Sequence, residues 1–173
     1  MPKMMPPNVT IWWVPQAGLT TPSAPKASEI NAGTNISAAV ETGYKLGPMD
    51  SDVDNSKTIA DGGNTDTPTM GKYEGMLTLF RDEVGSGTNV TPNPATVFST
   101  AFALFKTAKT AGWLVKRFGK QQSVTAAAGD VVSAFLFLND YPREIEGTKM
   151  APNRIEVEFF QQGSQFLNVT CVA

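Results

Sequence analysis

Apolar and polar positions alternate over several short segments of the chain, which is the pattern of half-buried β-strands. The alternation is sharpest over residues 154–161, where Ile155, Val157 and Phe159 share one side. Residues 72–81 alternate in the same way. Successive side chains of a strand point to opposite faces of a sheet. Both segments therefore predict strands with one face in a core and the other toward polar surroundings.

Further strands are expected where β-branched and aromatic residues gather. Residues 131–138 are apolar at nearly every position, so an interior strand covered on both faces is expected. A turn at Gly163 predicts that 154–161 and a final strand form a closing hairpin over 154–173. The remaining strand segments, which bring the total to about seven, are 9–14, 34–42, 113–118 and 165–172.

One segment, residues 94–110, has the apolar spacing of an amphipathic helix. Asn93 is the expected N-cap, Pro94 suits the first helical position, and Gly112 is the expected stop. The length suits a single domain over residues 1–173. The predicted fold is mainly β, an antiparallel β-sandwich or barrel-like domain with one flanking α-helix.

Residues 43–71 form a long stretch with few apolar anchors and several glycines and prolines. Loops of this length inside a compact domain usually have a function. We expect an extended arm with one short strand near 57–60. Its acidic residues are Asp50, Asp52, Asp54, Asp61 and Asp66. A calcium loop starting at Asp50 is an alternative, but Asn55 and Asp61 stand where an EF-hand needs Gly and Glu.

The composition excludes several kinds of chemistry. The 173 residues include no histidine and one cysteine, so no Ser-His-Asp relay and no Cys/His zinc site is expected. Cys171, with valines near it, is interpreted as a small apolar strand residue. The carboxylates of Glu156 and Glu158 share a strand face, the minimum for a glycoside hydrolase, but solvated strands often carry such a pair. We expect no enzyme activity, no metal and no cofactor.

Charge divides unevenly along the chain. Residues 1–87 hold six basic and ten acidic side chains, whereas residues 88–173 hold eight basic and six acidic ones. Attraction between an acidic arm and a basic region of another copy would build a head-to-tail stack. The basic interface residues expected from this interpretation are Lys106, Lys109, Lys116, Arg117 and Lys120. The longest apolar run, 131–138, is too short to span a bilayer, so no membrane partner is expected.

The order of several short motifs resembles one protein family. An early strand ends in WWVP at 12–15, residues 27–37 read ASEINAGTNIS, and residues 73–82 read YEGMLTLFRD. An apolar helix, NDYP at 139–142 and the closing segment from 155 to 172 follow. In this order the motifs resemble the tail tube (major tail) proteins of long-tailed, non-contractile bacteriophages.

The resemblance implies a structural subunit that assembles with itself. Six copies would close into a hexameric ring with a continuous inner β-barrel, and rings would stack into a hollow conduit for genome delivery to the host cell. The 43–71 loop and the chain termini would bridge neighbouring rings, and residues 1–27 would form an N-terminal strand and arm. Further implied partners are tail tip, tape measure and tail terminator proteins. The implied location is the virion, after assembly in the host cytoplasm.

Such a conduit would pass double-stranded DNA without sequence-specific binding. Lys and Arg hold phosphates, so an acidic or neutral wall lets a duplex slide. Carboxylates on strand faces are therefore the lumen candidates, namely Glu74, Glu156 and Glu158. The alternative function is a monomeric β-sandwich binding module, carbohydrate-binding or capsid-decorating, with an exposed aromatic platform built from Trp12, Trp13 or Trp113.

Overall fold

The computed structural model describes residues 8–54, 67–81, 83–84, 91–92, 96–147, 153–163 and 165–173. Within them, nine strands form one antiparallel sheet in the order β2-β1-β7-β8-β10-β4-β3, with β11 paired to β8 and β9 to β10. The strands are β1 (Val9–Pro15), β2 (Thr34–Asn35), β3 (Lys45–Asp54), β4 (Thr67–Phe80), β7 (Ala111–Phe118), β8 (Val131–Asn139), β9 (Arg143–Ile145), β10 (Arg154–Gln161) and β11 (Phe166–Thr170). The mainly β prediction is confirmed.

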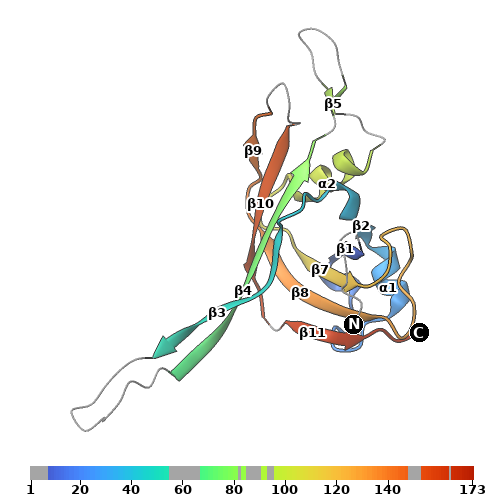
Figure 1. The fold of residues 1–173 in the computed structure, drawn as a ribbon, viewed down its shortest axis with the longest axis vertical. Helices are drawn as coiled ribbons and strands as arrows, with labels where there is room; N and C mark the ends of the chain where they lie inside the picture. The colour runs from blue at the N-terminus through green and yellow to red at the C-terminus, as the bar shows by residue number, and fades with distance from the viewer. Residues whose placement is uncertain are drawn as a thin grey trace, which may run out of the picture.

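Short elements complete the described chain. A separate two-stranded sheet pairs β5 (Glu83–Val84) with β6 (Thr91–Pro92). The helices are α1 (Ala27–Ala32) and α2 (Val97–Phe105), and two 3-10 turns are η1 (Gln16–Gly18) and η2 (Ser37–Ala39). The longer helix, α2, lies beside the upper part of the sheet (Figure 1). The single flanking helix of the prediction corresponds to α2.

The large sheet curls so that its two halves face each other. β4 and β10 lie on one side of the molecule and β1, β7 and β8 on the other (Figure 1). The Lys116 ammonium on β7 donates to the Leu46 carbonyl oxygen on β3 over 2.7 Å. This bond connects two strands that are far apart in the sheet order. The barrel-like prediction therefore corresponds to one curled sheet.

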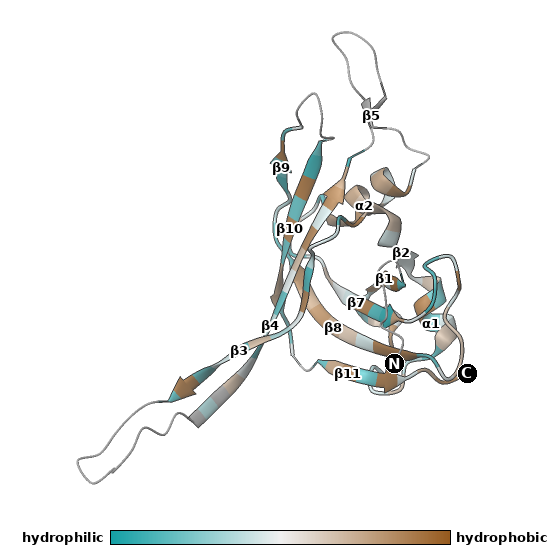
Figure 2. Ribbon diagram, viewed as in Figure 1, coloured by the Kyte–Doolittle hydropathy of each residue, from teal (hydrophilic) through white to brown (hydrophobic). Residues whose placement is uncertain are grey.

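The space inside the curl holds the main hydrophobic core. Trp13 of β1 packs edge-on against Phe105 of α2 with ring centroids 5.1 Å apart, and Phe105 packs likewise on Phe159 of β10 at 5.3 Å. Edge-to-face aromatic pairs add stability beyond the area that they bury. Hydrophobic and hydrophilic bands alternate along β10, as Figure 2 shows, because only one of its faces meets this core.

A second core lies on the other face of β1, β7 and β8. There Trp12, Val115 and Val132 pack with the buried Ile30 of α1. β8 thus contributes even-numbered side chains such as Val132 to one core and odd-numbered ones such as Phe135 to the other. The prediction that 131–138 forms an interior strand covered on both faces is confirmed.

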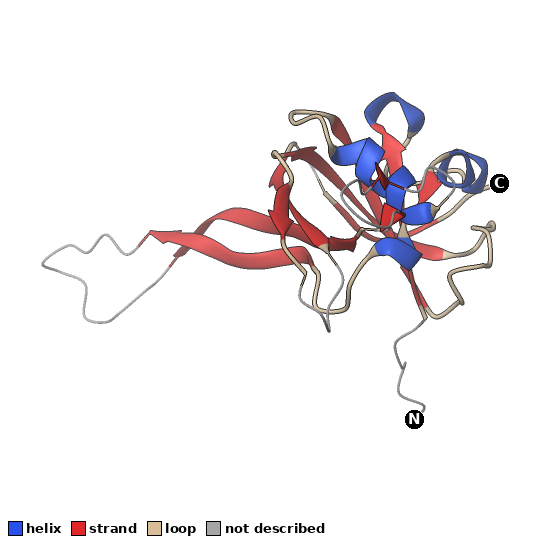
Figure 3. Ribbon diagram, turned by 90° about the horizontal axis from the view of Figure 1, so that it is seen from above, coloured by secondary structure: helices blue, strands red, loops and turns tan. Residues whose placement is uncertain are grey.

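β3 and β4 form a long two-stranded hairpin that runs out of the body (Figures 1 and 3). The two strands pair from Lys45 opposite Met76 out to Asp54 opposite Thr67. Residues 45–54 and 67–71, which were predicted as part of an extended arm with its one short strand elsewhere, are instead two paired strands. Apart from Leu46 and Gly47, no residue of β3 is buried, so hydrophobic periodicity gives no signal there. The strand expected near 57–60 lies outside the described residues.

The helix is shorter than predicted at both ends. Its N-cap is Thr96, whose hydroxyl oxygen accepts from the Ser99 N–H at 3.5 Å, while the expected cap, Asn93, lies outside the described residues. Beyond the other end, the Asn139 amide donates to the carbonyls of Phe105 and Thr107 at 3.0 Å. A side chain from β8 therefore caps the helix, and the predicted stop, Gly112, lies inside β7.

Two other strand predictions need correction. β11 pairs with β8, with Phe166 opposite Ala134 and Thr170 opposite Val131, rather than with β10. The predicted closing hairpin over 154–173 is therefore wrong, because both strands bind the same edge of β8 at different heights. The weak strand expected at 34–42 is confirmed only for β2, after which the chain forms η2.

Candidate functional site

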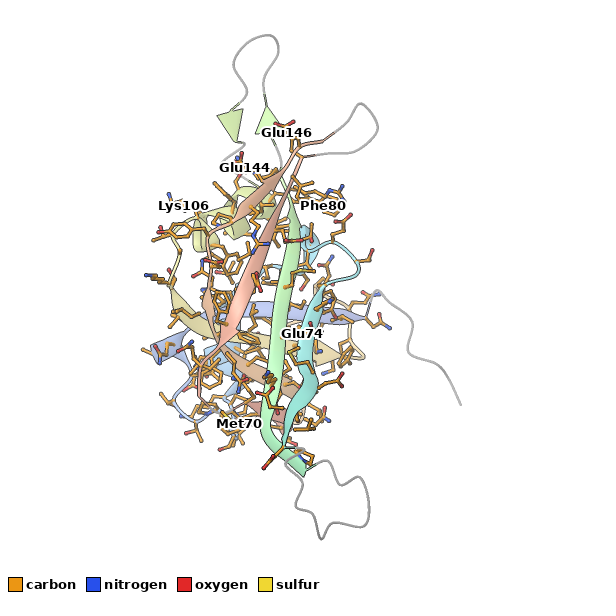
Figure 4. All side chains as sticks on the ribbon, turned by 90° about the vertical axis from the view of Figure 1, so that its left-hand side faces the viewer. Met70, Glu74, Phe80, Lys106, Glu144 and Glu146 are labelled. Atoms are coloured by element: carbon orange, nitrogen blue, oxygen red, sulfur yellow. The ribbon has the colours of Figure 1, made fainter. Side chains whose placement is uncertain are left out.

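The outer face of β4 and β10 brings the three predicted lumen carboxylates together. Antiparallel register sets Glu156 opposite Thr78 and Glu158 opposite Met76. Glu74 lies two positions before Met76, so it points to the same side. In Figure 4 these strands and β3 lie side by side toward the viewer, with Glu74 near the middle. No described element packs over this face, which we call the open face.

The open face carries cations as well as carboxylates. The Arg143 guanidinium of β9 lies 2.8 Å from a Glu158 carboxylate oxygen and 3.6 Å from one of Glu156. The Lys45 ammonium lies 3.7 Å from a carboxylate oxygen of Glu74. Sequence reasoning missed these cations. Once β3 is recognised as a strand, the register sets Lys45 opposite Met76 and Lys72 opposite Met49.

Exposed apolar residues accompany the charges on the hairpin. Met70 is 70% exposed, Val53 54% and Met49 46%, and Phe160 at the end of β10 is 48% exposed. A hollow of about 350 Å³ lies among Met49, Glu74 and Phe160. Grouped apolar side chains on a surface mark contact sites. The hairpin thus offers apolar area for burial against another molecule.

The structure divides the predicted basic interface. Lys106 and Lys109 are exposed just beyond α2, and in Figure 4 Lys106 lies toward the opposite end of the molecule from Met70 on the hairpin. Lys116 is half-buried. Its ammonium donates to the Leu46 carbonyl oxygen and lies 5.5 Å from the Phe135 ring centroid. Burial lowers the pKa of Lys116. Lys106 and Lys109 are therefore the more accessible of these three residues.

Arg117 has a role in the fold rather than in an interface. Its side chain is 1% exposed and forms a 3.0 Å ion pair with Asp130. The guanidinium also donates to the carbonyls of Gln121, Val124 and Thr125. These bonds hold the loop between β7 and β8. The interface prediction for Arg117 is wrong, because a buried side chain cannot contact another copy.

Asp130 accepts from several donors at once. Lys120, which is 46% exposed, completes the cluster with an ammonium 2.5 Å from the other Asp130 oxygen. Burial favours the neutral acid, but hydrogen bonds from Lys120, the Ala127 N–H and Arg117 outweigh it and lower the pKa of Asp130. We call Arg117, Lys120 and Asp130 the buried ion cluster.

The described acidic residues of the hairpin lie apart from one another along the strand. Asp50, Asp52 and Asp54 follow one another along β3, and Asp52 forms an ion pair with Lys72. Within the described ranges, no three acidic, histidine or cysteine side chains gather as a metal would require. Asp61 and Asp66 lie outside the described residues.

The aromatic platform of the binding-module alternative is not present in its predicted form. Trp12 and Trp13 are 3% exposed and Trp113 5%, so all three tryptophans belong to the two cores. Their β-strand positions alternate between the cores, which explains why a Trp-Trp pair can be fully buried. The exposed tryptophan platform predicted for a carbohydrate-binding module is wrong.

Comparison with known proteins identifies the family of this chain. None of the described helices has the length and apolar character needed to cross a membrane. A search of curated proteins finds no match. The family model described as "Phage tail tube protein" matches residues 1–173, the entire chain. The chain therefore belongs to the phage tail tube protein family and is a structural protein of the virion tail.

Proposed function

We propose that this subunit closes into a hexameric ring in which the open face lines a channel for the phage genome. The observation that carries the proposal is the open face itself, a solvated and charged sheet surface beside two apolar cores. A sheet with a free edge is prone to associate with other strands. β3 is the last strand in the sheet order and β9 pairs only with β10 among the described strands, so neighbouring subunits can meet at these edges.

Rings of this kind would stack along the tube axis. The β3–β4 hairpin projects from one end of the body, and Lys106 lies toward the other (Figure 4). Asp50 and Asp54 on the hairpin are exposed. Unlike charges at opposite ends favour head-to-tail contacts, while Met49, Val53 and Met70 supply apolar area. We propose that the hairpin bridges to the next ring near Lys106 and Lys109.

Other tail components would meet this tube at its ends and inside it. Membership of the family implies self-association and contact with other tail proteins. We propose tail tip and tail terminator proteins at the two ends and a tape measure protein inside the channel. Double-stranded DNA would later pass the same wall without sequence-specific contacts. Assembly would take place in the host cytoplasm.

Electron microscopy of the purified full chain tests ring formation directly. Negative staining at rising protein concentration should show separate rings or tubes of constant diameter. Light scattering on the same samples should rise with concentration. A protein that stays monomeric under all these conditions would contradict the proposal.

A shortened hairpin tests the bridge between rings. Met49 and Lys72 are directly opposite each other, so an Asn-Gly turn replacing residues 50–71 can join them as a two-residue hairpin loop. We expect the thermal unfolding midpoint of the body to be preserved and stacking to be lost. Tubes that still form with the shortened hairpin would exclude it as the bridge.

Charge reversal tests the proposed contact at the other end. Lys106→Glu should weaken stacking most at low salt, because salt screens exposed charges. Lys26→Glu is the matched control, since Lys26 is also exposed and the change in net charge is the same. Equal effects of the two substitutions would show that net charge, rather than the Lys106 contact, controls stacking.

A further inference from the structure

The open face is not simply acidic, because its cations are accompanied by carboxylates. Arg143, Lys45 and Lys72 each have a carboxylate oxygen within 4 Å, supplied by Glu158, Glu74 and Asp52 respectively. Arg154 likewise pairs with Glu41 at 2.7 Å. These side chains are the types that hold phosphate in nucleic-acid-binding proteins. The open face therefore contains groups that could bind phosphate but are already paired with carboxylates.

Arg143 is the most favourable phosphate ligand among them. Its side chain is 60% exposed, and a guanidinium can bind phosphate through two parallel N–H groups. Here Nη2 faces Glu158 at 2.8 Å and Nη1 faces Glu156 at 3.6 Å. The two glutamates are two positions apart on one face of β10, and Arg143 is directly opposite Glu156 in the register. The guanidinium fork is thus directed at carboxylates.

We propose that Glu156 and Glu158 keep DNA from binding to the open face by masking Arg143, that is, by occupying the guanidinium N–H groups that would otherwise bind phosphate. In this proposal their contribution to the net negative charge of the face is not what prevents binding. The inference rests on the proposed function, since it takes the open face as the surface that meets DNA. The partner is the phosphodiester backbone of a duplex, which both carboxylates displace from Arg143. The neutral amides of glutamine would leave the guanidinium charge uncompensated.

Binding of a fluorescent 30-base-pair duplex to the purified full chain tests the mask. Glu156→Gln/Glu158→Gln should bind the duplex at low salt several-fold more tightly than the parent protein. The gain should fall roughly eightfold for each tenfold rise in salt for every new phosphate contact. The single variant Glu158→Gln, which loses the shorter contact, should show part of the gain. It serves as the readout if the double variant fails to fold.

Two further variants separate masking from net charge. Adding Arg143→Gln to the double variant should abolish the gained binding, although the other cations of the face remain. Asp140→Asn/Glu146→Gln changes net charge by the same amount at a half-buried and an exposed residue that are in none of the described ion pairs. This control should show no gain.

The outcomes distinguish this inference from the proposed function. Equal gains in the control and the double variant, a gain that survives Arg143→Gln, or no gain at all would each overturn masking. Tubes seen by microscopy together with any of these results would leave the channel proposal standing. Masking without tubes would show that the charge pairing is real but that the face lines no channel.

Discussion

Arg117 and Arg143 each face carboxylate oxygens, but their surroundings differ. Arg117 is 1% exposed and lies 3.0 Å from Asp130 in the body. Arg143 is 60% exposed and lies 2.8 Å from Glu158 on the open face. A buried charge that loses its partner destabilises the fold strongly, whereas an exposed pair contributes little. Burial therefore decides whether the same contact stabilises the fold or controls the charge of a surface.

The two arginines also differ in what else they bind. Arg117 donates to the Thr10 hydroxyl on β1 and to three loop carbonyls, and its guanidinium carbon lies 4.9 Å from the centroid of the Trp12 ring. Arg143 contacts only carboxylates in the described ion pairs and hydrogen bonds. The first arginine connects β1, β7 and a loop, whereas the second remains available to a ligand once its partners are removed.

The largest expected effect follows from removing the buried arginine. Arg117→Ala should lower the free energy of unfolding by about 3–5 kcal/mol, because it leaves the buried Asp130 carboxylate without its fully buried partner and leaves three loop carbonyls without their donor. Urea unfolding followed by tryptophan fluorescence measures this change. A loss below 1 kcal/mol would show that burial does not separate the two arginines.

The acid dependence of stability is the next test of the buried ion cluster. The folded-state pKa of Asp130 is lowered from its ordinary value of 3.8. Its contribution to stability is therefore complete above that value and is lost as the pH falls through the lower folded-state pKa. Asp130→Asn should be less stable at pH 7 and should lose less stability between pH 5 and pH 2. If the free energy of unfolding fell equally with pH in the parent protein and in Asp130→Asn, the lowered pKa would not belong to Asp130.

A smaller effect is expected for the exposed member of the same cluster. Lys120→Ala should destabilise the protein by about 1.5 kcal/mol, since it removes a hydrogen bond to a charged group while Arg117 still pairs with Asp130. The same urea unfolding experiment measures it. A loss as large as that of Arg117→Ala would mean that Lys120, rather than Arg117, compensates the buried carboxylate.

The smallest effect is expected on the open face. Arg143→Ala should change the free energy of unfolding by about 0–1 kcal/mol, as is typical of exposed ion pairs. Thermal unfolding in low and high salt measures it. A loss of several kcal/mol would show that this pair also supports the fold, and the contrast between the two arginines would then disappear.

The sequence predicted the strands that have one buried face, because such strands alternate apolar and polar residues along the chain. Residues 154–161 are predicted with their exact bounds, and β8 is predicted as covered on both faces. The hairpin strand β3 was missed because Leu46 is its one side chain in the core. A single buried position gives no apolar period that would distinguish a ribbon from a loop. The strand with which β11 pairs could not be predicted either, because β11 binds β8 through backbone hydrogen bonds that any sequence can form.

The candidate site was predictable in part for the same reason. Alternation placed Glu156 and Glu158 on one face, and the register then added Glu74. Arg143 was not found, because β9 has three residues and shows no periodicity. Arg117 was assigned to a surface because neighbouring basic residues suggest a patch. Its burial depends on a loop that turns back over it.

The pairing of β1 with β7 has a consequence for the order of events during synthesis. Val9 pairs with Phe118, so about a hundred further residues must be synthesised before β1 can pair with β7. At typical translation rates this delay is roughly 5–20 s. The β3–β4 hairpin, by contrast, pairs residues close in sequence and can form early. A ribosome-bound chain can therefore expose the hairpin before its body has folded. If the hairpin bridges subunits as proposed, polysomes are the setting in which premature contacts between nascent subunits would arise.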